Sequence, residues 1–346
     1  MGSGIVSRVG ARRPGWDLCE VADLDVAGAC ELLATARALI PIASGAPPRR
    51  AELDVAGALR GSLILSLFSE PSTRTRLSFA VAARRLGAEV VDFVHDGASS
   101  ASKGETEADA LRNLDAMGFA AVVVRDRRDG YPRGMCELMR ARVVNAGDGQ
   151  REHPTQALLD ALAILEAFGR EPVPGAMRGL RVAICGDVRH GRVAHSDMLL
   201  LTMLGAEVVI AGPEALAPTE LADKFGVRRA PSLDEALRGT HVAIMLRVQR
   251  ERLAGVYVAT DADYHAAWGL CERRAGLLDP RGVVLHPGPM NRGVEIADAV
   301  ADGPRSRVLR QVTLGVAVRM AVLARACGGD LSSRLTGCLK GQEVAL

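Results

Sequence analysis

Aromatic residues make up only 3% of this 346-residue sequence, and lysine occurs only as Lys103, Lys224 and Lys340. So few aromatic side chains argue against a surface on which nucleic-acid bases stack. The 43 basic and 41 acidic residues nearly cancel, so the chain has no overall charge that would attract a polyanion. Nucleic acid is therefore not an expected partner.

Long apolar runs and paired cysteines are also missing. No run approaches the roughly 20 apolar residues that a membrane-spanning helix needs. The seven cysteines form no C-x-x-C pair, which favours free thiols in a reducing compartment over disulfides or a zinc site. Residues 1–16 show no signal-peptide pattern and are expected to form a flexible tail. We therefore expect a cytoplasmic protein with no membrane partner and no metal.

Short apolar runs and helical segments alternate from Gly61 onward, which is typical of βαβ units and parallel sheets. The length and the 48% apolar content are sufficient for two such domains. The expected fold is α/β, with two doubly wound parallel-sheet domains joined by interdomain helices. The first domain is expected at 17–152, with 306–346 packing back on it, and the second at 153–305. Expected strands are 62–68, 89–94, 120–125, 142–146, 180–186, 207–211, 241–246 and 282–286. Expected helices are 25–40, 73–86, 104–118, 133–140, 153–168, 192–204, 218–225, 232–238 and 308–327.

One strand-to-helix turn carries an unusual concentration of hydroxyl and guanidinium groups: Ser72, Thr73, Arg74 and Thr75. Helix N-terminal N–H groups and the helix dipole attract anions, and arginine and hydroxyl groups add donors. The turn therefore predicts an oxyanion site, with phosphate as the expected anion. An ordinary N-cap serine beside solvated arginines is the alternative.

Three further segments offer hydrogen-bond donors to a ligand. A polar loop contains Ser99 and Lys103, and the rarity of lysine in this chain draws attention to Lys103, whose alternative is a solvated loop lysine. Arg125 ends an apolar strand, and parallel strands present ligand-binding groups at their carboxyl ends. His153 and Gln156 are spaced to share one face of a helix start. A neutral histidine there can donate to a carbonyl oxygen, or it can be a structural cap.

The second half contains two arginines at strand ends, Arg192 and Arg247, with Gln249 close behind. Guanidinium groups bind carboxylates bidentately, so the pair favours a ligand with two carboxylates, although either arginine can instead form an interdomain ion pair. Gly288 and Pro289 lie in a rigid turn whose carbonyls can accept hydrogen bonds from a substrate, or which is simply a loop.

Two common nucleotide motifs are absent from the sequence. The turn at 186–191 follows a strand but lacks the G-x-G-x-x-G spacing of a dinucleotide site, and there is no G-x-x-x-x-G-K-[ST] sequence. Bound NAD or ATP is therefore disfavoured.

In this order, from about residue 18 to 328, the motifs resemble those of the aspartate carbamoyltransferase family within the aspartate and ornithine carbamoyltransferases. The resemblance implies transfer of the carbamoyl group of carbamoyl phosphate to the α-amine of L-aspartate, a step of pyrimidine biosynthesis, without a cofactor. It also implies a homo-oligomer, a trimer with active sites shared between subunits, and leaves room for a regulatory or dihydroorotase-type partner chain. Implied catalytic residues are Thr75, Lys103, Arg125 and His153. Implied contacts to carbamoyl phosphate are Ser72, Thr73, Arg74, Thr75, Ser99, Arg125, His153, Gln156, Gly288 and Pro289. Implied contacts to aspartate are Lys103, Arg192, Arg247 and Gln249.

Some residues distinguish this sequence from related ones. The sister family that acts on ornithine typically has His-Pro-Cys-Gln, whereas this chain has Thr155 at the third position. Asp126 stands where the aspartate family usually has histidine, and its charge is expected to weaken the field at Arg125. Ala80 stands where glutamate is common, and the region 41–60 is longer than usual. A paralogue with a different amino-acid acceptor and a non-catalytic assembly homologue are therefore retained as alternatives.

Overall fold

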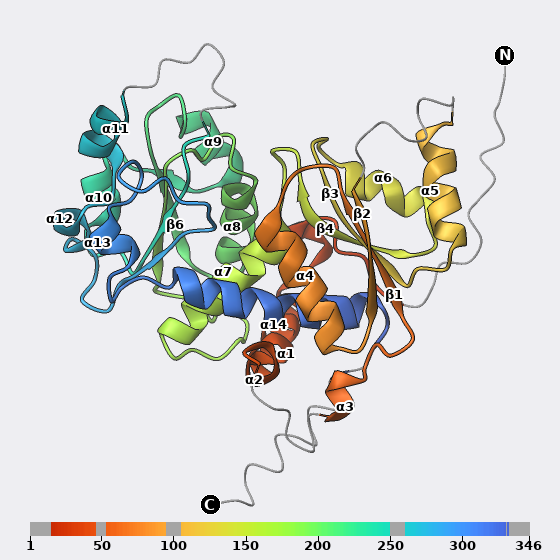
Figure 1. The fold of residues 1–346 in the computed structure, drawn as a ribbon. Helices are drawn as coiled ribbons and strands as arrows, with labels where there is room; N and C mark the ends of the chain where they lie inside the picture. Colours follow the sequence, from red (N-terminus) through yellow and green to blue (C-terminus); the bar gives the residue numbers. More distant parts are fainter. Residues whose placement is uncertain (1–14, 46–52, 95–104, 250–259, 330, 332–346) are drawn as a thin grey trace, which may run out of the picture. The chain divides into compact units, whose positions relative to one another are not determined.

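The computed structural model describes residues 15–45, 53–94, 105–249, 260–329 and 331, in two compact units (Figure 1). Unit 1 comprises residues 1–19, 38–149 and 319–346, and unit 2 comprises residues 20–37 and 150–318. Each unit contains a sheet whose paired strands are all parallel. The expectation of two parallel-sheet α/β domains is confirmed. Most of the predicted tail, residues 1–14, lies outside the described residues.

Unit 1 is built on a four-stranded sheet in the order β2-β1-β3-β4. Successive strands run outward from β1 to β2, and the chain then returns to the other side of β1 for β3 and β4. The winding therefore reverses between β1 and β3, and in open α/β sheets ligands bind outside the carboxyl ends of the strands at such a switch point. The strands are β1 (Leu63–Phe68), β2 (Glu89–Val94), β3 (Ala121–Asp126) and β4 (Arg142–Asp148). The main helices are α4 (Thr73–Arg85), α5 (Glu107–Ala116) and α6 (Tyr131–Leu138), with short helices α2 (Ile40–Ala43) and α3 (Leu53–Ala56).

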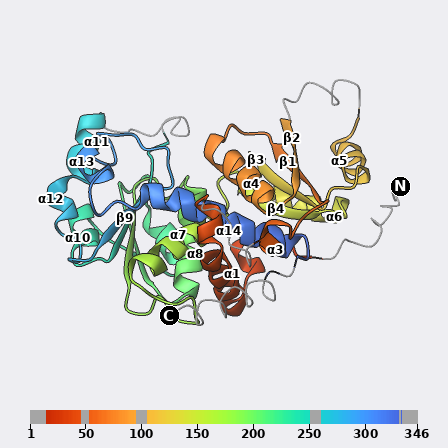
Figure 2. The same cartoon turned by 60° about the horizontal axis from the view of Figure 1, so that its bottom comes forward.

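The two faces of this sheet are covered by different helices (Figures 1 and 2). Leu67 of β1 and Val122 and Val124 of β3 belong to one buried cluster that also contains Leu111 of α5 and Met135 of α6. Helix α4 lies against the opposite face. Because side chains alternate along a strand, neighbouring residues at the end of β3 point to opposite faces.

Unit 2 contains a five-stranded sheet in the order β7-β6-β5-β8-β9. Its winding reverses between β5 and β8, which makes that edge a second switch point. The strands are β5 (Arg181–Cys185), β6 (Glu207–Ala211), β7 (Arg228–Arg229), β8 (Val242–Met245) and β9 (Val283–Leu285). Within the described ranges, the other helices are η1 (Val21–Asp23), α1 (Val26–Ala38), α7 (Pro154–Ala167), α8 (Arg192–Met203), α9 (Thr219–Phe225), α10 (Leu233–Leu237), α11 (Asp261–Trp268), α12 (Glu272–Ala275), α13 (Asp298–Ala301) and α14 (Val308–Ala326).

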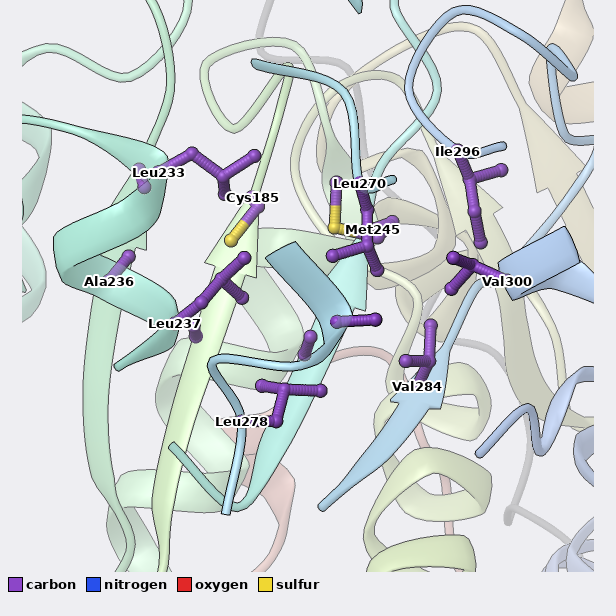
Figure 3. Packing of buried hydrophobic residues seen from close by; sticks show 14 of the residues in the cluster. Cys185, Leu233, Ala236, Leu237, Met245, Leu270, Leu278, Val284, Ile296 and Val300 are labelled. Carbon is purple, nitrogen blue, oxygen red and sulfur yellow. The ribbon is translucent and has the colours of Figure 1, made fainter. Parts of the chain in front are cut away.

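A continuous apolar core fixes the strands of unit 2 (Figure 3). Cys185 of β5, Met245 of β8 and Val284 of β9 pack in one cluster with Leu233 and Leu237 of α10. This packing holds β5 and β8 rigidly beside each other, so the residues that follow them start from fixed positions. Among the described residues, no helix is both long and apolar enough to cross a bilayer.

Candidate active site

The hydroxyl-rich turn of unit 1 opens helix α4. Ser72 is the N-cap residue with an extended backbone (φ −159°, ψ 92°), and its side chain makes no capping hydrogen bond. The first turn of α4 contains no acidic residue. The first N–H groups of an α-helix have no acceptor within the helix, and they lie at the positive end of its dipole. The turn thus has the features of an anion site. The Ser72 hydroxyl is not used for capping, and the first turn of α4 has no carboxylate that would repel an anion.

Arg125 lies on the same carboxyl edge of the sheet as this turn. In the β1–β3 pairing it stands opposite Phe68, the last residue of β1, and its carbonyl accepts a 3.0 Å hydrogen bond from the Ser69 N–H. Its Nε lies 3.3 Å from a carboxylate oxygen of Glu70, and its Nη1 donates to the Ala146 carbonyl at 3.3 Å. The Glu70 contact ties the Arg125 guanidinium to the segment that leads into α4.

Asp126 is directed elsewhere. Its carboxylate accepts hydrogen bonds from the Ser69 hydroxyl at 2.8 Å and from the Arg128 Nε at 2.8 Å. Burial alone would raise the pKa of Asp126, but the hydrogen bonds from Arg128 and Ser69 outweigh burial and lower it, so the group stays charged. Because Arg128 compensates that charge and strand alternation separates Asp126 from Arg125, the expected weakening of the field at Arg125 has no geometric support.

The other unit 1 candidates, Ser99 and Lys103, lie outside the described residues, within the gap at 95–104.

In unit 2, His153 and Gln156 both belong to the buried start of helix α7. His153 is its N-cap residue, with Pro154 as the first helical residue. The backbone N–H of His153 donates to the Ser196 hydroxyl of α8 at 2.9 Å, and that hydroxyl donates to Glu152 at 3.2 Å. Gln156 directs its Nε2 at Asp160, 3.1 and 3.2 Å from the two carboxylate oxygens. The start of α7 is therefore fixed at both candidate residues. The backbone of His153 is held by helix α8, and the side chain of Gln156 is held by the buried Asp160.

Arg192, Arg247 and Gln249 lie beyond the carboxyl ends of the switch-point strands. Arg192 is the buried first residue of α8, the helix that follows β5, and Arg247 comes two residues after β8. Gln249 donates from its backbone N–H to Asp187 at 3.3 Å and from its Nε2 to the His190 carbonyl at 3.2 Å. Asp187 thus links the segments after β5 and β8, which brings the three candidates of unit 2 to one edge.

A glycine makes this junction possible. Gly186 directly follows β5 and has φ +120°, a conformation that residues with a side chain rarely adopt. A Cβ atom there would lie 2.6 Å from the Leu246 carbonyl oxygen. The backbone segments that follow β5 and β8 can therefore approach each other this closely only with glycine at position 186.

His286 organises the Gly288–Pro289 turn. The backbone N–H of Gly288 donates to its Nδ1 at 2.8 Å, so the ring proton is on Nε2 and is donated to Glu295 at 3.1 Å. Glu295 also accepts from the backbone N–H of Asn291 at 2.5 Å. The Gly288–Pro289 peptide bond is cis. The turn is thus shaped by hydrogen bonds from both sides of the imidazole ring.

Sequence reasoning missed Glu70, which contacts Arg125, and the buried Asp160, which accepts from Gln156 and has Asp197 as a buried neighbour. Both aspartates are fully buried, in α7 and α8. The available signal was a single acidic residue within an otherwise apolar helical stretch, because a charge is rarely buried there without a partner. Among the described residues, no group of three or more His, Cys, Asp or Glu side chains is arranged to hold a metal ion.

The chain matches both domain models of one family. Residues 17–166 match the aspartate/ornithine carbamoyltransferase carbamoyl-P binding domain, and residues 178–326 match the Asp/Orn binding domain. The aspartate carbamoyltransferase catalytic subunit of Parafrankia sp. (strain EAN1pec) is 45% identical over 317 residues, 92% of this chain and 98% of the relative. That of Magnetococcus marinus is 48% identical over 275 residues, 78% of this chain and 82% of the relative.

Solved structures of the same two kinds of enzyme also resemble this chain. The aspartate transcarbamoylase of Trypanosoma cruzi in complex with N-(phosphonacetyl)-L-aspartic acid superimposes with a TM-score of 0.77 and 30% identity, over 90% of this chain and 95% of that one. The ornithine carbamoyltransferase of Thermus thermophilus gives a TM-score of 0.75 and 26% identity, over 90% and 98% of the two chains. With both domain models matched and close relatives aligned over nearly its whole length, this chain belongs to the aspartate/ornithine carbamoyltransferase family.

Proposed function

We propose that this chain transfers the carbamoyl group of carbamoyl phosphate to the α-amine of L-aspartate, giving N-carbamoyl-L-aspartate and phosphate. The main support for the proposal is the set of cationic and hydrogen-bonding residues at the carboxyl edge of each sheet, where the winding reverses. In unit 1 the edge carries an anion-binding helix start with Arg125, and in unit 2 the edge carries two arginines. The relatives named above as aspartate carbamoyltransferases support the same acceptor.

The phosphate of carbamoyl phosphate is assigned to the start of α4, where Ser72, Thr73, Arg74 and Thr75 supply hydroxyl, guanidinium and backbone donors. The carbonyl oxygen is assigned to Thr75, Arg125 and His153. As the aspartate amine attacks the carbonyl carbon, negative charge develops on that oxygen and a tetrahedral intermediate forms. A positioned donor at such an oxygen contributes about 3–4 kcal/mol in comparable acyl-transfer sites. Collapse of the intermediate breaks the bond between the carbonyl carbon and the phosphate oxygen, and the departing phosphate takes the proton that the amine loses.

The remaining candidates are assigned to orientation. Gln156 and the Gly288–Pro289 turn would hold the carbamoyl amide, and Gln249 would support the acceptor. Arg192 and Arg247 would bind the two carboxylates of aspartate as bidentate pairs. Holding the amine against the carbonyl converts a bimolecular reaction into an effectively unimolecular one.

Ornithine is the second candidate acceptor, since the Thermus thermophilus ornithine enzyme has a similar fold. Ornithine has one carboxylate and a cationic side chain, and two arginines at one edge of unit 2 disfavour that cation. The decisive assay supplies carbamoyl phosphate with a panel of amino acids and identifies the carbamoylated product. Carbamoyl-aspartate is the expected product; carbamoyl-ornithine would overturn the acceptor assignment, and no product with any acceptor would favour a non-catalytic homologue.

Arg247→Ala tests the assignment to the acceptor carboxylates. The KM for aspartate should rise at least tenfold, because one bidentate ion pair is removed, while the KM for carbamoyl phosphate stays within twofold. Arg238→Ala is the matched control: it removes an exposed arginine that precedes β8 rather than follows it. Equal aspartate kinetics in the two variants would refute the role of Arg247.

A shared active site is proposed for Ser99 and Lys103, which would reach a neighbouring subunit of a homotrimer. If that is so, mixing inactive Lys103→Ala subunits with inactive Arg74→Ala subunits should restore part of the activity, because some mixed interfaces contain one intact site. No restoration after subunit exchange has been verified by mass would contradict a shared site.

A further inference from the structure

Two fully buried carboxyl groups lie behind the candidate site in unit 2. Asp160 comes from α7, four residues after Gln156, and Asp197 comes from α8, one residue after Ser196. The two helices pack against each other. A buried pair of carboxyl groups cannot carry two negative charges at low cost, so one of them must hold a proton.

The hydrogen bonds identify Asp160 as the charged member. It accepts from Gln156 Nε2 at 3.1 and 3.2 Å and from Gln311 Nε2 at 2.6 Å. The orientation of the Gln311 amide is settled independently, because its Oε1 accepts the backbone N–H of His286 at 3.0 Å. Gln311 must therefore present its NH₂ group to Asp160, and Asp160 must accept.

Asp197 has the opposite character. Neither of its carboxyl oxygens has a hydrogen-bond partner of good geometry among the described residues. Burial raises the pKa of Asp197 well above its usual range, and the charge and hydrogen bonding of the neighbouring Asp160 raise it further. Because Asp160 accepts from two amide groups while Asp197 accepts from none among the described residues, we assign the shared proton to Asp197 and the negative charge to Asp160.

This arrangement has a consequence for Gln156. A glutamine amide is planar, with an NH₂ group on one side and an oxygen on the other, and the two can exchange by rotation about the last side-chain bond. A carboxylate at Asp160 accepts only the NH₂ group, which turns the Oε1 of Gln156 away from it. We propose that Asp160 is a positioning residue that fixes the Gln156 amide so that its oxygen faces the NH₂ group of the carbamoyl substrate. This inference rests on the proposed carbamoyl transfer.

Two amide substitutions separate this role from general packing. Asp160→Asn replaces the acceptor by a group of the same size that has an NH₂ of its own. Gln311 can still donate to the remaining oxygen, but the new NH₂ favours the reversed Gln156 amide, which would set NH₂ against the substrate NH₂. We expect kcat/KM for carbamoyl phosphate to fall at least tenfold. Asp197→Asn mimics the neutral carboxyl and should keep kcat/KM within threefold of the parent chain.

A double-mutant cycle shows whether the effect passes through Gln156. In a Gln156→Ala background, Asp160→Asn should cause no further loss of kcat/KM, because no amide remains to be oriented. Multiplicative losses, an Asp197→Asn loss as large as that of Asp160→Asn, or an Asp160→Asn enzyme equal to the parent would each overturn the proposal. Thermal unfolding of all variants identifies losses that come from misfolding.

Infrared spectroscopy provides a readout that does not depend on turnover. The parent chain should show the C=O stretch of a buried protonated carboxyl group, and Asp197→Asn should remove it. If the parent lacks that band, the charge assignment fails even when the enzyme is active. If the band is present but no amino acid is carbamoylated, the proposed function fails while the charge assignment of the pair stands.

Discussion

Replacing Glu295 by alanine should destabilise unit 2, because it leaves two hydrogen-bond donors without their acceptor. One Glu295 oxygen, Oε1, accepts both the buried Nε2–H of His286 at 3.1 Å and the partly buried N–H of Asn291 at 2.5 Å. The other oxygen, Oε2, receives no hydrogen bond from a described residue, so its removal adds no loss. A buried donor left without an acceptor costs about 1–3 kcal/mol. With Asn291 only partly buried, the free energy of unfolding should fall by about 2–4 kcal/mol.

Urea unfolding at a fixed protomer concentration measures this change, because oligomerisation would otherwise contribute to the apparent stability. Asp298→Ala is the matched control. Asp298 lies three residues further along the chain, but its side chain is 71% exposed and pairs with Arg292 at the surface. Its removal should leave the urea midpoint unchanged. If the two variants unfold at the same urea concentration, the hydrogen bonds around His286 do not stabilise the turn as described.

Two further predictions concern carboxylates held by arginines. Asp126→Asn should leave the KM for carbamoyl phosphate within twofold while lowering the urea midpoint, because Asp126 is paired with Arg128 and not with Arg125; a clearly lower KM would mean that its charge does oppose Arg125. Hydrogen bonds from two arginines lower the pKa of Asp234 to about 2. A depressed carboxyl pKa contributes stability that is present above the unfolded value near 3.9 and lost as the pH falls to about 2. The unfolding free energies of the parent and Asp234→Asn should therefore differ at pH 6 and converge by about pH 2, and a gap that is independent of pH would contradict the ion-pair explanation.

The sequence predicted the central strands of both sheets well because their patterns are strong. β1 is apolar except for Ser66, β3 begins with four apolar residues, and β5 is apolar after Arg181, as expected for strands buried on both faces. Strand β7 was not predicted: it consists only of Arg228 and Arg229, and it exists because β6 offers it a pairing edge. Helix α11 was not predicted either, although Thr260 and Asp263 form a local cap that signals a helix start.

The candidate site shows the same division between local and tertiary information. The hydroxyl turn at Ser72 and the strand-end position of Arg125 were recognisable because both depend on local order along the chain. The partners of those residues were not, because Glu70 meets Arg125 and Asp160 meets Asp197 only after helices and strands have packed. The direction of the Asp126 side chain is partly a local property. Alternation along a strand predicts that it differs from the direction of Arg125, but only after β3 is known to extend to Asp126.

Gln311 has a consequence for attempts to change the acceptor of this enzyme. Its single side-chain amide joins the chain before the Gly288–Pro289 turn to the buried carboxylate behind Gln156. Engineers who randomise the 287–294 loop to accept another amino acid would be altering a segment whose starting point this residue fixes from a distant helix. Libraries that vary the loop while Gln311 stays constant should yield more folded, active clones than libraries that vary both, and Glu at position 311 should be depleted because it lacks the NH₂ group that Asp160 accepts.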